Sequence, residues 1–147
     1  MMDKGKHLKA IAENYYRSGQ WLCSEAIVMV INDIVENPLP PQVVKLASGF
    51  PVGIGAAGCS CGALTGGVMA LGLAFGRTEP GGDNAKILRL SKELHDWFIE
   101  EYGSTCCRVL VKKVEFGGAA HMDQCTGITG AVAEFVAHLI EKECGPA

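Results

Sequence analysis

Hydrophobic residues recur with helical spacing in several separate segments of the chain. Apolar side chains fall every three or four positions in the four longest of these segments, residues 4–17, 23–36, 83–101 and 125–143. Shorter helices are expected from the two prolines at 40 and 41 toward Ala47, and over residues 105–113. No segment alternates convincingly as a strand would, although RVLVKKVEF comes closest. The pattern predicts one all-α domain spanning residues 1–147, a helical bundle of about five to seven helices.

Proline, glycine and capping residues indicate where these helices begin and end. Asp83 is a suitable N-cap for the helix over 83–101. The segment ENPLPPQ separates the second helix from the short one that follows. Gly145 and Pro146 are expected to end the last helix.

A stretch without charged residues separates Lys45 from Arg77. It is long enough to cross a membrane, for which about 20 apolar residues suffice. It contains Pro51 and nine glycines, however, and the glycines of its first half favour a loop. Only residues 61–75 have helical character, which is short for a membrane span. We therefore expect a buried helix and no membrane insertion.

This glycine-rich helix has two distinct faces. Four glycines fall in one stripe and four bulky residues fall opposite them, the two sets being Gly62, Gly66, Gly72 and Gly76, and Leu64, Val68, Leu71 and Phe75. A glycine stripe lets a second backbone approach closely. The helix is predicted to be central, with the stripe forming either a homodimer interface or a close contact within the chain.

Composition narrows the possible partners. The chain has 48% hydrophobic and 20% charged residues, which is typical of a folded globular protein. Its net charge is −3, and no basic run exceeds the pair Lys112–Lys113, so nucleic acid is not expected as a partner. The N-terminal sequence lacks an apolar signal segment, which favours a cytoplasmic location.

The seven cysteines are the main candidates for chemistry. In a reducing compartment they are more typical of ligands or reactive thiols than of disulfides, and no CxxC pair occurs. Four of them follow expected helix starts, namely Cys23, Cys61, Cys107 and Cys125. The N–H groups and dipole of a helix start stabilise a thiolate, so the pKa of these thiols is expected to fall. If the four helix starts converge, they form a thiolate group able to bind an iron–sulfur cluster or zinc.

Other interpretations of these residues stay open. A free cysteine often packs simply as a small hydrophobe. Cys59 and Cys106 could be spare ligands or resolving thiols, while Cys144 is expected to be an exposed thiol without a role. His121 lies four residues before Cys125, a possible ligand spacing, although a solvated loop histidine is commoner. Two further histidines, His95 and His138, are expected at the rims of the apolar faces of their helices.

The order of the cysteines resembles the C-GCAxxG-C-C family of redox-active proteins. The segment CGALTG at residues 61–66 is the specific element, with Cys23 before it and Cys107 and Cys125 after it. The chain departs from the family pattern where Ser60, not glycine, precedes Cys61. The two further cysteines near the motif positions, Cys59 and Cys106, are additional.

The resemblance implies a redox role in which Cys23, Cys61, Cys107 and Cys125 are the defining cysteines. A similar region in split-Soret cytochromes is associated with an iron–sulfur cluster, so the resemblance favours a cluster for electron transfer with a partner protein. We expect [2Fe–2S] in preference to [4Fe–4S]. Without a CxxCH motif, covalent haem is not expected.

Two alternatives to a cluster remain. A metal-free thiol–disulfide protein would use Cys59 with Cys61, or Cys106 with Cys107. A structural zinc site would use the same four ligands as the cluster, and a dimeric bundle with inert buried thiols is also compatible. No nucleophile–base pair can be recognised in the sequence, so enzymatic activity is left open.

Overall fold

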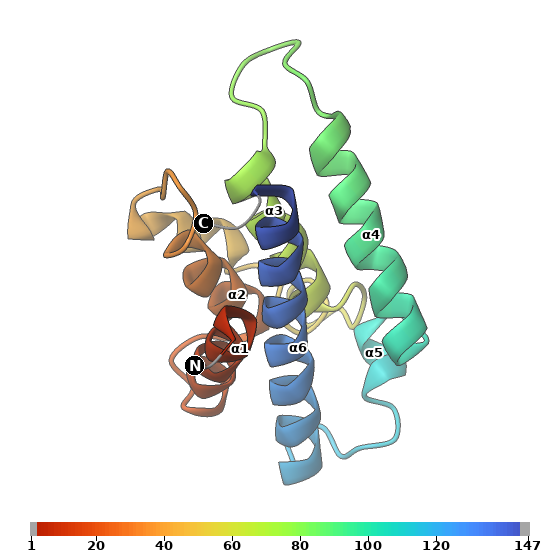
Figure 1. Ribbon diagram of the computed structural model, residues 1–147. Coiled ribbons are helices and arrows are strands. Elements are labelled where there is room, and N and C mark those ends of the chain that lie inside the picture. Colours follow the sequence, from red (N-terminus) through yellow and green to blue (C-terminus); the bar gives the residue numbers. More distant parts are fainter. Residues whose placement is uncertain (1–2, 145–147) are drawn as a thin grey trace.

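The computed structural model describes residues 3–144 and contains only helices as named elements in that range (Figure 1). Six α-helices and one 3-10 helix follow one another along the chain: α1 (Lys4–Arg17), α2 (Cys23–Asn32), η1 (Pro41–Ala47), α3 (Gly62–Phe75), α4 (Ala85–Tyr102), α5 (Cys107–Leu110) and α6 (Ala119–Cys144). The predicted all-α class is confirmed. One isolated bridge, between Ser60 and Cys106, is the only extended pairing among these described residues.

The boundaries of the first helices follow from local hydrogen bonds. α1 spans the predicted residues 4–17, and the Asp3 carboxylate accepts a hydrogen bond from the backbone N–H of Gly5 at 3.1 Å. α2 was predicted to reach residue 36 but ends at Asn32. The Asn32 side chain binds both the carbonyl and the N–H of Leu39, at 2.7 and 3.0 Å, and so fixes the turn that follows.

The predicted start of the last helix was wrong. α6 begins at Ala119, six residues before the expected position at 125, because alanine, methionine and glutamine after the Gly117–Gly118 break all favour a helix. Cys125 therefore lies in the second turn of α6 and not at its start. Gly145 and Pro146, which were expected to end this helix, lie outside the described residues.

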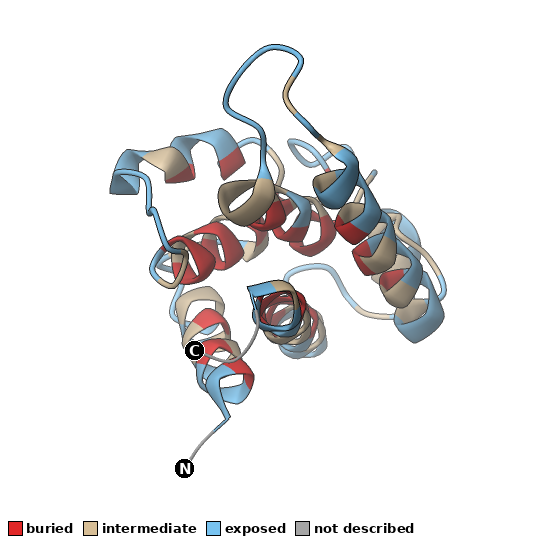
Figure 2. Cartoon of the chain, turned by 45° about the horizontal axis from the view of Figure 1, so that its top comes forward, coloured by how far each residue is buried: buried red, intermediate tan, exposed pale blue. Residues whose placement is uncertain are grey.

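The core lies between α6, α3 and the helices that flank them. α6 packs against α1, α2 and α3, while α3 packs against α2, α4 and α6. Figure 2 shows the buried residues on the inward faces of these helices and the exposed ones on the outer faces and loops. The largest completely buried apolar side chains are Phe98, Ile27, Ile31, Leu71, Leu90, Leu94, Val132 and Val136. The prediction that the glycine-rich helix is central is thus confirmed.

The glycines of α3 are used within the chain. A Cβ atom at Gly66 would lie 2.6 Å from the Ser24 Cα atom, so α2 crosses α3 with its backbone almost in contact. A Cβ at Gly72, by contrast, would meet nothing within 4 Å. On the opposite face Leu64 and Leu71 are buried, but Val68 is 38% exposed. The close contact within the chain therefore accounts for the N-terminal part of the glycine stripe. The homodimer stays a prediction.

No helix in residues 3–144 combines the length and the apolar character that crossing a membrane requires.

Candidate functional site

The loop between η1 and α3 has an unusual backbone. Five consecutive residues, from Val52 to Ala56, have positive φ angles, and three of them are not glycine: Val52 (58°), Ile54 (67°) and Ala56 (66°). Such a conformation costs about 1–3 kcal/mol for each non-glycine residue, so it persists only where surrounding contacts enforce it. Two hydrogen bonds close the loop, from Gly58 N–H to the Val52 carbonyl at 3.2 Å and from Cys59 N–H to the Gly53 carbonyl at 2.9 Å.

The end of this loop pairs with the segment that leads into α5. The Ser60–Cys106 bridge is flanked by hydrogen bonds from Cys61 N–H to the Thr105 carbonyl at 2.7 Å and from Cys107 N–H to the Cys59 carbonyl at 2.5 Å. The pairing brings the starts of α3 and α5 together although they are far apart in sequence. It therefore places Cys61 and Cys107 side by side in space.

Two glycines make room for the cysteines in this arrangement. A Cβ atom at Gly53 would lie 2.8 Å from the Cβ atom of Cys107, and the positive φ of 68° also favours glycine there. A Cβ at Gly62 would overlap the sulfur of Cys23. The glycine after Cys61 thus allows the Cys23 side chain to approach the start of α3.

All four cysteines predicted from the sequence line one small cavity. Cys23 begins α2, Cys61 is the N-cap of α3, Cys107 begins α5 and Cys125 projects from the second turn of α6. The cavity has a volume of about 40 Å³, space for a few water molecules. No lysine, arginine or carboxylate is among the other lining residues, which include one histidine. The convergence of these four thiols on one cavity is the central feature of the molecule.

Three further polar residues line the cavity, and only His121 was expected there from the sequence. Tyr16 reaches the cavity from α1, and while burial raises the pKa of the neighbouring Cys125, the Tyr16 hydroxyl acts to lower it. Thr129 lies one turn after Cys125, and its buried Oγ1 has no hydrogen-bond partner within residues 3–144. The spacing of Thr129 on α6 was a signal available in the sequence. The approach of Tyr16 depends on α1 packing against α6, which no local pattern reveals.

His121, the predicted minor ligand, also lines the cavity. The backbone N–H of Gly117 donates a hydrogen bond to its Nδ1 atom at 3.1 Å, and the ring of Phe116 lies 4.7 Å from its own. Because Nδ1 accepts a hydrogen bond, the neutral ring carries its proton on Nε2. A metal-ligating histidine usually donates a hydrogen bond through its second nitrogen, so this arrangement favours His121 as a donor to the cavity and not as a ligand.

The expected lowering of the thiol pKa values was wrong for the folded protein. Burial raises the pKa of Cys23 to about 12 and that of Cys61 to about 11, and it also raises the pKa of Cys107 and Cys125. The helix-start effect acts in the predicted direction, since the N–H groups of Ala63 and Leu64 lower the pKa of Cys61. Desolvation and the neighbouring thiols outweigh it. Without a bound cation the four groups are therefore neutral thiols at pH 7.

The donor set suits a soft metal centre, but not a single ion as it stands. Four thiols and no carboxylate match the ligands of iron–sulfur clusters and of zinc. Over residues 3–144, no three His, Cys, Asp or Glu side chains are placed to hold one metal ion. The structure therefore brings four soft donors to one cavity without closing them around a single ion.

The remaining cysteines differ in accessibility. Cys59 and Cys144 are exposed, and Cys106 is half-buried with its thiol donating to the Gly58 carbonyl at 3.1 Å. The expectation that Cys144 is an exposed thiol is confirmed. All seven cysteines are free thiols in the structure.

This difference predicts the order of alkylation. In the reduced, metal-free protein at pH 8, iodoacetamide should modify Cys59 and Cys144 at least about tenfold faster than Cys23 and Cys61, because only accessible thiolates react. Mass spectrometry of peptides from a time course measures the rates. In the urea-unfolded protein the difference should vanish. Equal rates in the folded protein would contradict the buried site.

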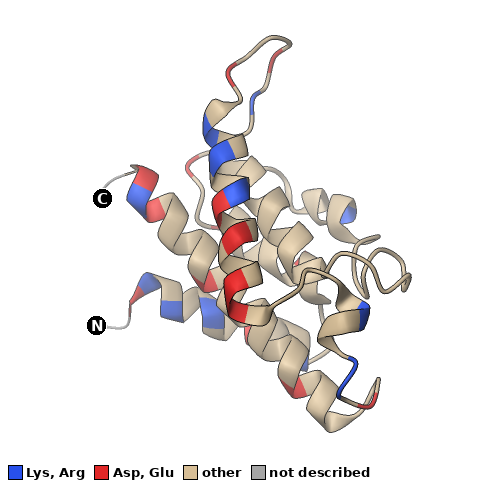
Figure 3. Ribbon diagram, turned by 90° about the vertical axis from the view of Figure 1, so that its right-hand side faces the viewer, with Lys and Arg blue, Asp and Glu red and all other residues tan. Residues whose placement is uncertain are grey.

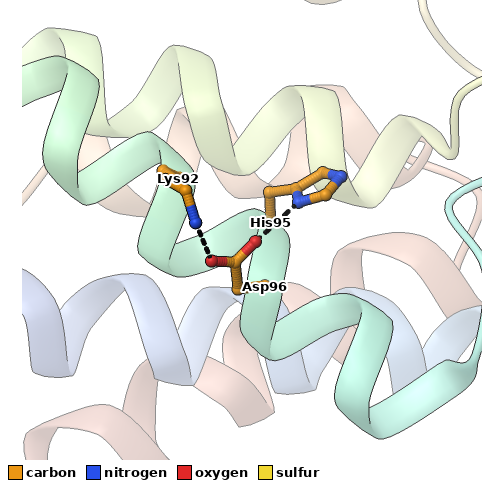
Figure 4. Close-up of polar contacts among 3 residues, drawn as sticks. All are labelled: Lys92, His95 and Asp96. Atoms are coloured by element: carbon orange, nitrogen blue, oxygen red, sulfur yellow. Dashed lines mark hydrogen bonds and ion pairs between the residues drawn. The ribbon is translucent and has the colours of Figure 1, made fainter.

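His95 and His138 are exposed on their helices, as predicted. His95 Nδ1 is 3.0 Å from Asp96 Oδ1, and Lys92 contacts the other carboxylate oxygen, as Figure 4 shows. The contacts with Lys92 and then His95 lower the pKa of Asp96. His138 Nε2 lies 3.9 Å from Asp3 Oδ2 on a similarly exposed surface. Lys92 and Asp96 line an open surface hollow that contains no cysteine, so this group is separate from the cysteine cavity.

One comparison with known proteins gives a match that covers the four cysteines of the cavity. Comparisons with curated proteins and with solved structures found no match. A family model described as "Putative redox-active protein (C_GCAxxG_C_C)" matches residues 21–139, which include all four cysteines of the cavity and most of the helical core. The chain belongs to the C_GCAxxG_C_C family of redox-active proteins.

Proposed function

We propose that this protein is an electron-transfer protein in which Cys23, Cys61, Cys107 and Cys125 hold an iron–sulfur cluster. The observation that carries the proposal is that four thiols, with no carboxylate among them, line one buried cavity. Four cysteine thiolates are the usual ligand set of such clusters. When bound, the cluster supplies one-electron oxidation and reduction.

The surroundings of the sulfurs support this role. Backbone N–H groups of Ser24 and Val52 interact with the Cys23 sulfur, and those of Ala63 and Leu64 interact with the Cys61 sulfur. Hydrogen bonds to ligand sulfurs stabilise the additional negative charge of a reduced centre. The strained loop has a clear use here, because it carries the Val52 N–H to Cys23.

The size of the cavity favours the smaller cluster. A volume of about 40 Å³ accommodates a few water-sized groups, which is closer to the four-atom core of [2Fe–2S] than to the eight-atom core of [4Fe–4S]. Side-chain donors available at this cavity are the Tyr16 hydroxyl beside Cys125, the Nε2–H of His121 and the unpartnered Thr129 hydroxyl. We expect the electron partner to be a cytoplasmic protein.

Anaerobic reconstitution tests the proposal. Reduced protein incubated with iron and sulfide should acquire about two irons and two sulfides per chain and a brown colour with visible absorption. Replacing any one of the four cavity cysteines by serine should remove most of the iron and sulfide, since thiolates bind these irons far better than hydroxyls. Cys144→Ser is the matched control, because its exposed thiol is remote from the cavity lining, and it should load like the wild type.

Two other results would contradict the proposal in different ways. A colourless protein that binds zinc through the four cysteines and takes up no sulfide would indicate the structural alternative. A protein that binds neither, yet cycles a cysteine pair between thiol and disulfide with dithiothreitol and an oxidant, would indicate the metal-free alternative. The extended pairing sets Cys59 opposite Cys107, so that pair is the first to examine by differential alkylation.

A further inference from the structure

A second, larger concavity adjoins the cysteine cavity. It is a groove of about 660 Å³ between α1, the α4–α5 connection and α6. Val109, Leu110 and Ile128 supply apolar lining, and Ala131 extends it along α6. The volume lies in the range of sites for small organic molecules. No residue of the groove belongs to the proposed cluster ligands.

The groove carries an excess of positive charge on a chain whose net charge is −3. Lys9, Lys112 and Lys113 line it, and the last two follow α5 in the segment shown blue between α5 and α6 in Figure 3. The only carboxylate in the lining, Asp123, is already paired with Arg17 at 2.9 Å. Within residues 3–144, neither Lys112 nor Lys113 forms an ion pair. Two ammonium groups therefore remain for an anion from outside the chain.

Hydrogen-bonding groups in the lining complement this charge. The Ser104 hydroxyl oxygen accepts a hydrogen bond from Cys106 N–H at 3.0 Å, which leaves its own proton to donate. The Gln124 amide is engaged with the Leu110 carbonyl and so shapes the wall. A site with lysine charges, a hydroxyl donor and an apolar wall suits a phosphate group attached to an apolar body.

The groove and the cysteine cavity share a wall. Ile128 lines both spaces. Tyr102, which lines the groove, has a raised pKa mainly because it is buried, and the charges of Glu101 and Cys61 contribute as well. A molecule in the groove would therefore be separated from the thiols by little more than one side chain.

We propose that this groove binds a small organic phosphate, with the phosphate at Lys112 and Lys113 and the apolar body against Ile128, next to the cysteine cavity. This binding does not depend on what the cavity holds. It is a ligand site additional to the proposed electron-transfer function.

Titration with phosphates that differ in one property tests the site. Flavin mononucleotide and phenyl phosphate present a phosphate on an aromatic body, riboflavin presents the flavin body without the phosphate, and inorganic phosphate lacks the body. Both organic phosphates should bind and shift the backbone amide NMR signals of Gly103 and Gly127, which line the groove. Riboflavin and inorganic phosphate should each bind at least roughly tenfold more weakly than flavin mononucleotide, since one lacks the ion pairs and the other lacks the apolar contact.

Variants of the groove make the result specific. The double variant Lys112→Ala/Lys113→Ala should weaken the binding of flavin mononucleotide roughly tenfold and leave the binding of riboflavin unchanged. Gly127→Phe should block the binding of both flavin mononucleotide and riboflavin. A Cβ at Gly127 meets nothing within 4 Å, so a large side chain there enters the groove. Gly127→Ala controls for folding. Lys86→Ala is the matched charge control, since its ammonium lies over the Phe75 ring at 5.3 Å and is not part of the groove.

The outcomes separate cleanly. Binding that needs the phosphate, the two lysines and an open groove supports the proposal. Failure of both organic phosphates to bind, or binding indifferent to the lysine pair and to Gly127→Phe, overturns it. Metal-free protein serves for all titrations, so the result is independent of whether a cluster can be reconstituted.

Discussion

Gly66→Ala should lower the free energy of unfolding by about 3 kcal/mol, the upper end of the usual cost of adding one methyl group to a packed core. The added Cβ would lie 2.6 Å from the Cα and 2.9 Å from the carbonyl oxygen of Ser24. Both are backbone atoms, so no side-chain rotation relieves the overlap. The helices α2 and α3 would have to separate.

The surroundings of Ser24 make that separation costly. Ser24 is completely buried, and its hydroxyl donates a hydrogen bond to the Ala47 carbonyl at 2.8 Å, which ties α2 to η1. Cys23 is its immediate neighbour and lines the cysteine cavity. Moving α2 away from α3 would therefore displace one wall of the site as well as part of the core. Cluster loading should fall together with stability.

Gly72→Ala in the same helix is the matched control, and it should raise the free energy of unfolding. Its Cβ would meet nothing within 4 Å, and alanine is the better helix former by about 0.5–1 kcal/mol. Urea denaturation of the reduced, metal-free proteins measures both changes. If the two variants are equally stable, the close crossing of α2 and α3 is not present in solution.

The glycine-rich helix shows how far the sequence could lead. Its length and the Gly62–Gly66 stripe were predictable, because both follow from helical periodicity along one segment. Which backbone fills the stripe was not, since a second copy of the chain and α2 satisfy the same small-residue pattern. The start of α6 was also predicted wrongly, because a local cap signal competed with helix-forming residues before it. Asp123 is a good cap in isolation, yet the helix formers before it extend the helix past that position.

The four cysteines of the candidate site could be predicted from the sequence, but Tyr16 and the electrostatics of the cavity could not. Cys23, Cys61 and Cys107 each stand at a helix start, which is a local signal. Their convergence depends on the pairing around Ser60 and on the left-handed loop, both long-range features. Burial then reverses the expected direction of the pKa shifts, because the desolvation of a thiolate depends on the whole fold and not on the helix that carries it.

The metal-free protein should lose stability steeply above pH 9. Cys23 and Cys61 have folded-state pKa values of about 12 and about 11, raised from an ordinary value of 9.0. Below pH 9 both thiols are protonated in the folded and the unfolded chain, so they contribute no pH dependence to the free energy of unfolding. Above pH 9 the unfolded chain releases these protons while the folded chain retains them, which favours unfolding. At pH 10 the two groups together should cost about 3 kcal/mol relative to pH 8.

Urea denaturation at pH 8, 9 and 10 under anaerobic reducing conditions measures this loss. In Cys23→Ser/Cys61→Ser the contribution of about 3 kcal/mol should disappear, whereas Cys59→Ser/Cys144→Ser should lose stability like the wild type, because those thiols are exposed. Far-UV circular dichroism at pH 8 checks that both double variants are folded. A decline that is the same in all three proteins would mean that the cavity thiols are not buried as neutral groups. The predicted decline also bears on function, because any metal centre bound through these thiols must displace their protons, and its binding should therefore weaken as the pH falls.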